Sequence, residues 1–485
     1  MNRYTPIWGA IASGLCLFIA MQYTVFFLAW LALVPVLIPL FNRSSLTPFR
    51  AGLFLGGTIA CLAFAWMIAG IHAFTGLASG YGIALFLLCA VLFAGGCAVV
   101  LWLSFRIPHP LFIAAGWTLA EMALQWAAGG LPWFLLHAGN AVSANLYAIQ
   151  PAAVTGVAGL SFVIVWVNAL IAKAIAGRSY KQLWLPGALF IGYLCWGWLL
   201  LYLFERSENN HPQQPFKLAI LQQNIPPEIQ WNQTNGNALV QQLLQQERQC
   251  IAQQPNMILW SESAIPWTYS PDDDLIKELM HNSAPANISH ILGMNTAITG
   301  DVVCNSAYCL LPGGRAAGRY DKTTPLLFIE QPWQGWLLPF FSANGYSVQP
   351  GKNNLPLATP YGKAGVLICN ESALPAAAAA TVRQGAQFLL NLSNDGWFRD
   401  TWLVNSHFYN ARLRAVETRK DLAINSNNGR SGLVSASGRI SEETLVRIRP
   451  NTVQPVAVRY PLLPACICIL SLLFTIVINQ KTKLT

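Results

Sequence analysis

Residues 364–380 read AGVLICNESALPAAAAA, an apolar run that ends at Cys369 and continues into polar residues, a proline and a run of alanines. The first part is typical of a buried β-strand, and the second of a helix that begins at a proline. Cys369 therefore follows a strand, at the position where open sheets expose reactive side chains. A strand-end cysteine can equally be a small packed hydrophobic residue, so its role depends on the rest of the chain.

Eight short β-rich runs, the one that ends at Cys369 among them, recur from Phe216 onward and are separated by turn residues. Helical patterns lie between some of them, at residues 235–253, 273–284, 374–386 and 402–420. Strands that alternate with helices and hairpins predict an α/β or α+β sandwich in which helices cover the sheets. We expect residues 205–459 to form one such domain.

The rest of the chain is too apolar for a protein in water. The 485 residues are 54% hydrophobic and 10% charged, whereas soluble proteins have roughly 25% charged residues. Glu121 is the only acidic residue before position 205, and the other 19 acidic residues lie in 205–459 beside 20 Lys and Arg. This distribution predicts a membrane domain at 1–204, a soluble domain at 205–459 and a further membrane segment at 460–485.

Eight apolar runs approach the length of about 20 residues that a bilayer crossing needs. Seven precede the soluble domain and one follows it: 5–22, 24–41, 50–71, 80–104, 110–128, 154–176, 183–204 and 461–479. The first run leads directly into the second without a clear cleavage site, so we interpret it as a retained span rather than a signal peptide.

Lys and Arg occupy alternate connections between these runs. They precede the first span, recur after spans two, four and six, and end the chain, while the connections near 22–23, 72–79 and 129–153 contain none. By the positive-inside rule both termini are cytoplasmic and residues 205–459 lie on the outer face. The expected location is the inner membrane of a bacterium, with the soluble domain in the periplasm.

The same distribution argues against other classes of protein. The net charge of +9 lies mainly in short membrane connections and forms no basic stripe for nucleic acid. Eleven cysteines are present, but none belongs to a cluster with metal-ligand spacing, so we expect no metal. Cys304 and Cys309 would meet oxidising conditions, but five residues apart on a strand they point to opposite faces, and their pairing is open.

Two features of the membrane domain stand out. Glu121 is an ionisable group at membrane depth, which indicates either a functional site or a hydrogen bond between helices. The uncharged loop GGLPWFLLHAGNA (129–141) is typical of an interfacial or re-entrant segment, because tryptophan favours the headgroup level. The loop would then line a route by which a lipid reaches an outer-face site.

Glu262 and Lys322 end two further β-rich runs of the soluble domain, and Glu330 follows Lys322. Acyl transfer needs a nucleophile, a base and a group that stabilises an oxyanion, and Cys369, Glu262 and Lys322 can fill these roles in that order. A helix N-terminus and nearby cations would favour the Cys369 thiolate. Each residue also has an ordinary interpretation as core, cap or solvated charge, and His407 on a helical pattern is interpreted as structural.

Six segments together carry a family resemblance: GLPW, LQQNIPPEIQW, WSESAIP, KTTPLLFIE, LICNES and NLSNDGWF. With Glu, Lys and Cys in this order, the soluble domain resembles the nitrilase (carbon–nitrogen hydrolase) superfamily. Its insertion between seven spans and one span resembles the bacterial apolipoprotein N-acyltransferase family, over nearly the whole chain. The resemblance implies a four-layer αββα sandwich beside a polytopic helical membrane domain.

The resemblance also implies roles for individual residues. Cys369 would be the nucleophile, Glu262 the general base and Lys322 the oxyanion-stabilising cation. Supporting and substrate-binding residues would be Glu330, Glu371, Asn370, Trp231 and Trp133. The implied reaction is ping-pong: an sn-1 acyl chain of a phospholipid passes to the cysteine as a thioester, and then to the α-amino group of diacylglyceryl-cysteine on an apolipoprotein. No cofactor is implied.

Two positions depart from the family pattern. The loop reads LLFIEQP where VPFGEY is usual, so Gly and Tyr are missing beside Glu330, and Asn370 replaces a common tyrosine after the cysteine. We expect these changes to affect which acyl donor and which acceptor amine the protein prefers. One alternative function is a membrane-tethered amidase for small amides, but a single span would suffice to anchor it. Another is a transporter or assembly factor, but the spans offer few polar groups for the path of an ion or polar substrate.

Overall fold

The computed structural model describes residues 5–43, 47–75, 79–128, 131, 136–210, 214–226, 229, 231–327, 330–331, 347–398 and 401–484. The chain divides into two compact units. The helical unit comprises residues 1–129, 133–203 and 460–485, and the sandwich unit comprises residues 130–132 and 204–459.

The helical unit contains a helix or a pair of helices at each apolar run. These are α1 (Thr5–Gln22), α2 (Phe26–Ala29), α3 (Val34–Phe41), α4 (Pro48–Phe64), α5 (Met67–Thr75), α6 (Ser79–Arg106), α7 (Pro110–Ala127), α8 (Ala152–Ala176), α9 (Trp184–Asn210) and α15 (Leu463–Leu484). Among the described residues, four helical segments are long and apolar enough to cross a membrane, and three shorter apolar ones precede them. The number of crossings stays a prediction.

The second expected span is broken rather than continuous. Helix α2 ends at Ala29 and α3 begins at Val34. The turn between them buries Trp30, Ala32 and Leu33. Asn168 of α8 satisfies that backbone: its Oδ1 accepts from the Leu33 N–H at 2.9 Å, and its Nδ2 donates to the Ala29 carbonyl at 2.9 Å. Because backbone groups left unpaired in lipid are costly, this amide is what makes the break tolerable.

The sandwich unit contains two mixed sheets. The first has the order β13-β1-β2-β3-β4-β5, with β6 paired to β4, and the second has the order β12-β11-β10-β9-β8-β7. The strands are β1 (Phe216–Ile220), β2 (Met257–Leu259), β3 (Ser289–Thr299), β4 (Val302–Leu310), β5 (Ala316–Asp321), β6 (Ser347–Val348), β7 (Leu357–Thr359), β8 (Gly362–Ile368), β9 (Phe388–Asn394), β10 (Leu422–Asn427), β11 (Gly432–Val434), β12 (Ile440–Ser441) and β13 (Leu445–Ile448).

Parallel pairs form the middle of each sheet, β1–β2–β3 in one and β8–β9–β10 in the other. Parallel strands place their carboxyl ends at the same edge. Alternate residues of both sheets meet in one core, where Leu218 and Leu259 of the first sheet cluster with Val366 and Leu390 of the second. This shared core fixes the two sheets face to face.

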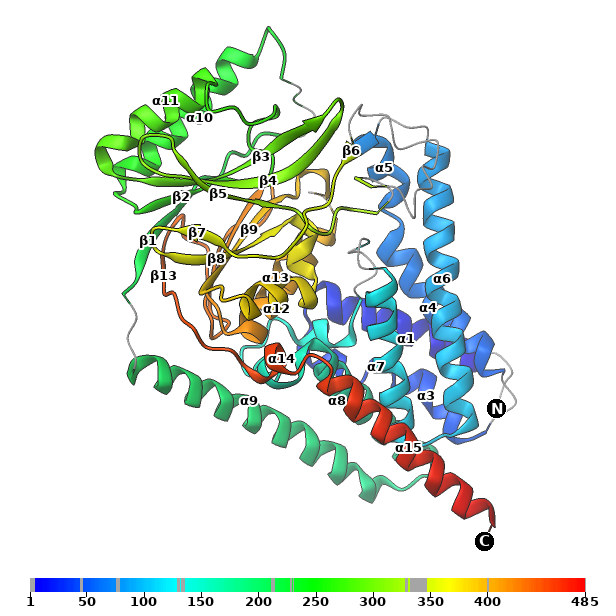
Figure 1. The fold of residues 1–485 in the computed structure, drawn as a ribbon. Coiled ribbons are helices and arrows are strands. Elements are labelled where there is room, and N and C mark those ends of the chain that lie inside the picture. Colours follow the sequence, from blue (N-terminus) through cyan, green and yellow to red (C-terminus); the bar gives the residue numbers. More distant parts are fainter. Residues whose placement is uncertain are drawn as a thin grey trace. The chain divides into compact units, whose positions relative to one another are not determined.

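Helices cover the outer faces of both sheets (Figure 1). Helices α10 (Gly236–Ala252) and α11 (Asp274–Ser283) pack Leu243 and Leu279 into a second core with residues of β2 and β3. Helices α12 (Pro375–Arg383) and α13 (Leu403–Thr418) contact β8 and β10 of the other sheet. The arrangement is a four-layer αββα sandwich, and the predicted fold class is confirmed.

The four helices predicted in this unit are present to within a few residues, and the eight predicted β-rich runs contain β1 to β4 and β8 to β11. Strand β5 was expected only as a strand end before Lys322, and its bounds were not predicted, because its sequence AAGRYD is half exposed and has no apolar alternation. Strands β6, β7 and β12 are only two or three residues long and are defined by their partners rather than by their own sequence.

Candidate active site

Three strand ends bring polar residues together in the sandwich unit. Glu262 follows β2 and Lys322 follows β5 in one sheet, and Cys369 follows β8 in the other. The Lys322 Nζ lies 3.6 Å from Glu262 Oε1, and the Glu262 carboxylate lies close enough to the Cys369 thiol for each to affect the pKa of the other. The three residues that the sequence suggested therefore form one cluster, built from both sheets.

Cys369 occupies a strained turn. It is the first residue of a 3₁₀ turn, Cys369–Ala373, and its φ of 52° lies in the left-handed region. For a residue with a Cβ such a backbone costs of order 1–3 kcal/mol and persists only where neighbours hold it. The thiol is therefore presented by a fixed bend between strand and turn, and not by the first turn of an α-helix, since α12 begins only at Pro375.

Glu371 is a main support of that bend. Its Oε2 accepts from the Ile368 N–H at 2.8 Å, and its Oε1 accepts from the Thr323 N–H at 2.8 Å. The Tyr320 hydroxyl donates to the same carboxylate at 3.0 Å. Because Tyr320 and Thr323 flank Lys322, this one buried carboxylate ties the turn of the nucleophile to the loop of the cation.

Glu262 is held by two donors. The Asn305 amide donates to Oε1 at 2.8 Å, and the backbone N–H of Asn394 donates to Oε2 at 3.1 Å. Asn305 belongs to β4 and Asn394 to the carboxyl end of β9, so the carboxylate accepts hydrogen bonds from both sheets. Its side chain is almost entirely buried.

Lys322 is fully buried between two carboxylates. Its Nζ lies 2.8 Å from Glu330 Oε2, closer than to Glu262, and Glu330 Oε2 also accepts from the Leu326 N–H at 2.6 Å. Glu330 therefore fixes both the ammonium group and the loop that follows it. A buried lysine of this kind needs such partners, since an unpaired charge would be expelled from the interior.

The electrostatics of the cluster favour a protonated thiol at rest. Burial, with the nearby Glu262, raises the pKa of Cys369 well above its ordinary value. Burial also raises the pKa of Glu262, although Lys322 opposes the shift. Burial alone would lower the pKa of Lys322, but Glu330, Cys369 and Glu262 outweigh it and the pKa is raised. Burial thus outweighs the expected effect of the nearby cation, so the thiol needs a base, and Glu262 contacts it.

The remaining predicted residues are spread around this cluster. The Asn370 amide donates to the Thr324 carbonyl at 2.9 Å, and its buried Oδ1 has no hydrogen-bond partner among the described residues. Trp231 packs edge to face on Trp267, with ring centroids 5.5 Å apart. Trp133 lies outside the described residues.

Residues that sequence reasoning missed are Asn305, Asn394 and Asp395. The last two stand in the segment NLSND at the end of an apolar strand, which is the same signal that singled out Glu262 and Cys369. His407 is close to Cys369, as its Nε2 lies 2.9 Å from the Cys369 carbonyl oxygen. This contact is to the backbone and not to the thiol.

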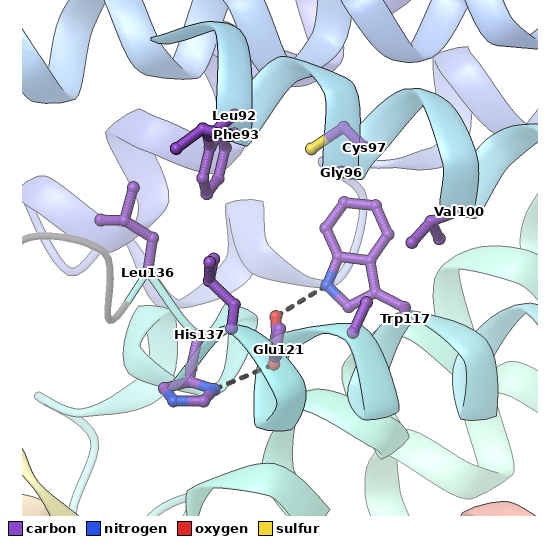
Figure 2. A pocket seen from close by; sticks show the side chains of 11 residues that line it. Leu92, Phe93, Gly96, Cys97, Val100, Trp117, Glu121, Leu136 and His137 are labelled. Carbon is purple, nitrogen blue, oxygen red and sulfur yellow. Dashed lines mark hydrogen bonds and ion pairs between the residues drawn. The ribbon is translucent and has the colours of Figure 1, made fainter. Parts of the chain in front are cut away.

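Glu121 of the helical unit makes hydrogen bonds within that unit (Figure 2). Its Oε1 accepts from Trp117 Nε1 at 2.7 Å and from the Ala138 N–H at 2.8 Å, and its Oε2 lies 3.1 Å from His137 Nδ1. The three side chains border a largely apolar pocket with about 590 Å³ of empty volume, part of it open to the outside. Glu121 thus anchors the segment around residue 138 to helix α7.

Within the residues that the structure describes, no group of three or more His, Cys, Asp or Glu side chains is arranged to hold a metal ion. Cys304 and Cys309 are both free thiols on β4. Cys309 belongs to the core between the sheets and Cys304 does not, as expected for residues an odd number of positions apart on a strand.

Comparison with known proteins matches both units. Residues 13–170 match the family model for the apolipoprotein N-acyltransferase N-terminal domain, and residues 217–444 match that for carbon–nitrogen hydrolase. Apolipoprotein N-acyltransferase from Geobacter metallireducens is 27% identical over 437 residues, which are 85% of this chain and 82% of that protein. Its counterpart from Gloeobacter violaceus is 26% identical, over 88% of this chain and 84% of that protein.

Solved structures with similarity to the chain include a carbon–nitrogen hydrolase from Helicobacter pylori (16% identity, TM-score 0.36, 49% of this chain and 87% of that one). An amidase from Nesterenkonia sp. is also similar (16% identity, TM-score 0.36, 50% of this chain and 92% of that one). The two family matches account for the helical unit and the sandwich unit in their order along the chain. The chain therefore combines an apolipoprotein N-acyltransferase N-terminal domain with a carbon–nitrogen hydrolase domain that follows it.

Proposed function

We propose that this protein transfers an acyl chain from a membrane phospholipid, through a thioester on Cys369, to the N-terminal amine of diacylglyceryl-cysteine in apolipoproteins. The observation that carries the proposal is the cluster of Glu262, Lys322 and Cys369 in a domain that the chain joins to apolar helices. The similarity to apolipoprotein N-acyltransferases supports the substrate class.

In the first half of the reaction Glu262 takes the thiol proton as Sγ attacks the ester carbonyl of the phospholipid. The carbonyl oxygen becomes an oxyanion, and the buried Lys322 ammonium supplies the positive charge beside it. The intermediate collapses by breaking the bond to the glycerol oxygen, which receives the proton from Glu262. The products are a Cys369 thioester and a lysophospholipid.

In the second half the neutral α-amine of the acceptor attacks the thioester carbonyl. Glu262 takes a proton from the attacking nitrogen, Lys322 again faces the oxyanion, and the C–S bond breaks. The leaving thiolate regains its proton from Glu262, which restores the resting site with an amide on the acceptor. Burial of all three residues keeps water from competing for the thioester.

Several roles follow from the contacts. Glu330 holds Lys322 and Glu371 holds the turn of Cys369, whereas the family resemblance alone assigns Trp231 and Trp133 to substrate binding. Asn370 and the loop around Glu330 are where this chain departs from its relatives, and we assign donor and acceptor preference to them. The soluble domain, residues 205–459, faces the periplasm from the bacterial inner membrane, and the distribution of Lys and Arg supports this orientation.

The test is lipid-dependent acylation of Cys369. Purified full-length protein incubated with phosphatidylethanolamine should gain the mass of one acyl chain on the peptide that contains Cys369, and neutral hydroxylamine should remove it. C369S should gain no hydroxylamine-sensitive mass. Equal labelling of C369S, or release of ammonia from simple amides without an acyl-enzyme, would favour the membrane-tethered amidase instead.

A further inference from the structure

His407 of α13 reaches beneath the turn that carries the nucleophile. Its Nε2 lies 2.9 Å from the Cys369 carbonyl oxygen and 2.7 Å from the Ser372 hydroxyl. Its Nδ1 lies 2.8 Å from Asp395 Oδ1. Asp395 is itself buried at the end of β9, where it also accepts from the Ser393 hydroxyl at 2.9 Å.

These contacts define the protonation of the ring. A carbonyl oxygen only accepts hydrogen bonds, so Nε2 must carry a proton to approach Cys369 so closely. An ionised carboxylate also only accepts, so Nδ1 must carry the second proton. In agreement, the burial of His407 is outweighed by Asp395 and its pKa is raised, while the pKa of Asp395 is lowered by His407 against the effect of burial.

His407 and Asp395 support the strained backbone at Cys369. Cys369 has a left-handed backbone, and its carbonyl defines the orientation of the peptide that follows it. That carbonyl receives His407 Nε2 and the Ser372 hydroxyl, the latter at 3.0 Å. The residue before Asp395, Asn394, donates its backbone N–H to Glu262. One short segment, 394–395, therefore positions the base directly and the nucleophile through His407.

We propose that His407 and Asp395 are a positioning pair, in which a doubly protonated imidazole holds the turn of Cys369 so that its thiol meets Glu262. The pair takes no proton from the thiol and touches no substrate. The charged groups that face His407 are Asp395 and Glu262. This inference rests on the proposed function only in taking Cys369 as the nucleophile.

Two readouts at Cys369 in the full-length protein test the pair: alkylation by iodoacetamide, followed on the Cys369 peptide by mass spectrometry, and acylation by phosphatidylethanolamine. H407A should slow both by about ten- to a hundredfold, which corresponds to the loss of one hydrogen bond to a charged group. The phospholipid concentration for half-maximal rate should stay the same, since the pair does not touch the lipid.

A paired substitution separates positioning from simple packing. In H407Q the new amide has one donor nitrogen and one acceptor oxygen, whereas Asp395 and the Cys369 carbonyl both need a donor. The amide oxygen must therefore face one of these two acceptors, so the rates of alkylation and of acylation should both fall. In H407Q/D395N the amide introduced at position 395 can donate to the amide oxygen at position 407, while the amide nitrogen at position 407 donates to the Cys369 carbonyl. This uncharged chain of donors should recover at least about tenfold over H407Q. If H407A does not fold, the comparison of H407Q with H407Q/D395N still tests the proposal.

His290 provides a matched control in the same unit. It is another buried histidine beside a glutamate, with Nε2 3.7 Å from Glu247 Oε1, and it lies on β3 rather than under Cys369. H290Q should lower thermal stability but leave Cys369 alkylation of the folded protein within twofold of wild type.

Alkylation of H407A at the wild-type rate, or no gain in H407Q/D395N over H407Q, would overturn the positioning role. If phosphatidylethanolamine never acylates the wild type while alkylation follows the predicted order of variants, the proposed function fails and the pair stands.

Discussion

Replacement of Glu371 by glutamine tests how the turn of Cys369 is held. Oxygen Oε1 accepts from the N–H groups of Thr323 and Thr324 and from the Thr323 hydroxyl, while Oε2 accepts from the Ile368 N–H. Glutamine keeps one acceptor oxygen. If this oxygen stays with the threonines, the new NH₂ group faces the Ile368 N–H, and one hydrogen bond to a charged group is lost.

The magnitude follows from these contacts. The lost bond contributes about 1.5–3 kcal/mol, and the bonds that remain weaken from charge-assisted to neutral, which adds roughly 1 kcal/mol. We therefore expect E371Q to lower the unfolding free energy by about 2.5–4 kcal/mol. Acylation of Cys369 should slow as well, because the strained turn loses the bond at the residue that precedes it.

Denaturant titration of the purified protein and the rate of Cys369 acylation measure the two effects. E443Q removes the same charge from an exposed position of the same unit and serves as the control, with a change expected within about 0.5 kcal/mol. An E371Q protein as stable as E443Q and acylated within twofold of the wild-type rate would refute the assignment of Glu371 as the support of this turn.

Two further predictions concern pH and topology. Burial raises the pKa of Glu247 from 4.5 to about 8, so the folded protein retains a proton that the unfolded chain has lost, and this group should make stability fall as the pH rises across that range. E247Q should flatten that part of the stability profile, and an unchanged slope would contradict the assignment. A periplasm-active reporter fused near Asn209 should be active, whereas activity only at the C-terminus would show that the spans are miscounted.

Sequence patterns predicted the strand ends that carry Glu262 and Cys369, because both follow apolar runs that stop abruptly. Lys322 was also expected at a strand end, but the bounds of its strand could not be predicted, since β5 has no apolar pattern and owes its place to pairing with β4. Its importance came from the family resemblance and from its spacing to Glu330.

The supports of the nucleophile could not be read from the sequence in the same way. Asp395 and His407 lie 26 and 38 positions beyond Cys369, and His407 sits on a helix whose pattern gives no sign of a partner. The contact exists because α13 packs against the turn at Cys369–Ala373, which is a property of the assembled layers. Hydrogen bonds between side chain and distant backbone leave no periodic trace in a single sequence.

The break between α2 and α3 has a consequence for the order of assembly. The amide that caps it stands 135 positions later than Leu33, so the break has no permanent partner while the first five apolar runs enter the membrane. Until α8 arrives, the Leu33 N–H lacks this acceptor and the Ala29 carbonyl lacks this donor, so these two groups must stay hydrated or find another partner. Nascent chains arrested before residue 168 should therefore leave the Leu33 N–H open to hydrogen exchange, and chains that include α8 should protect it; equal protection in both would show that the break is stable without Asn168.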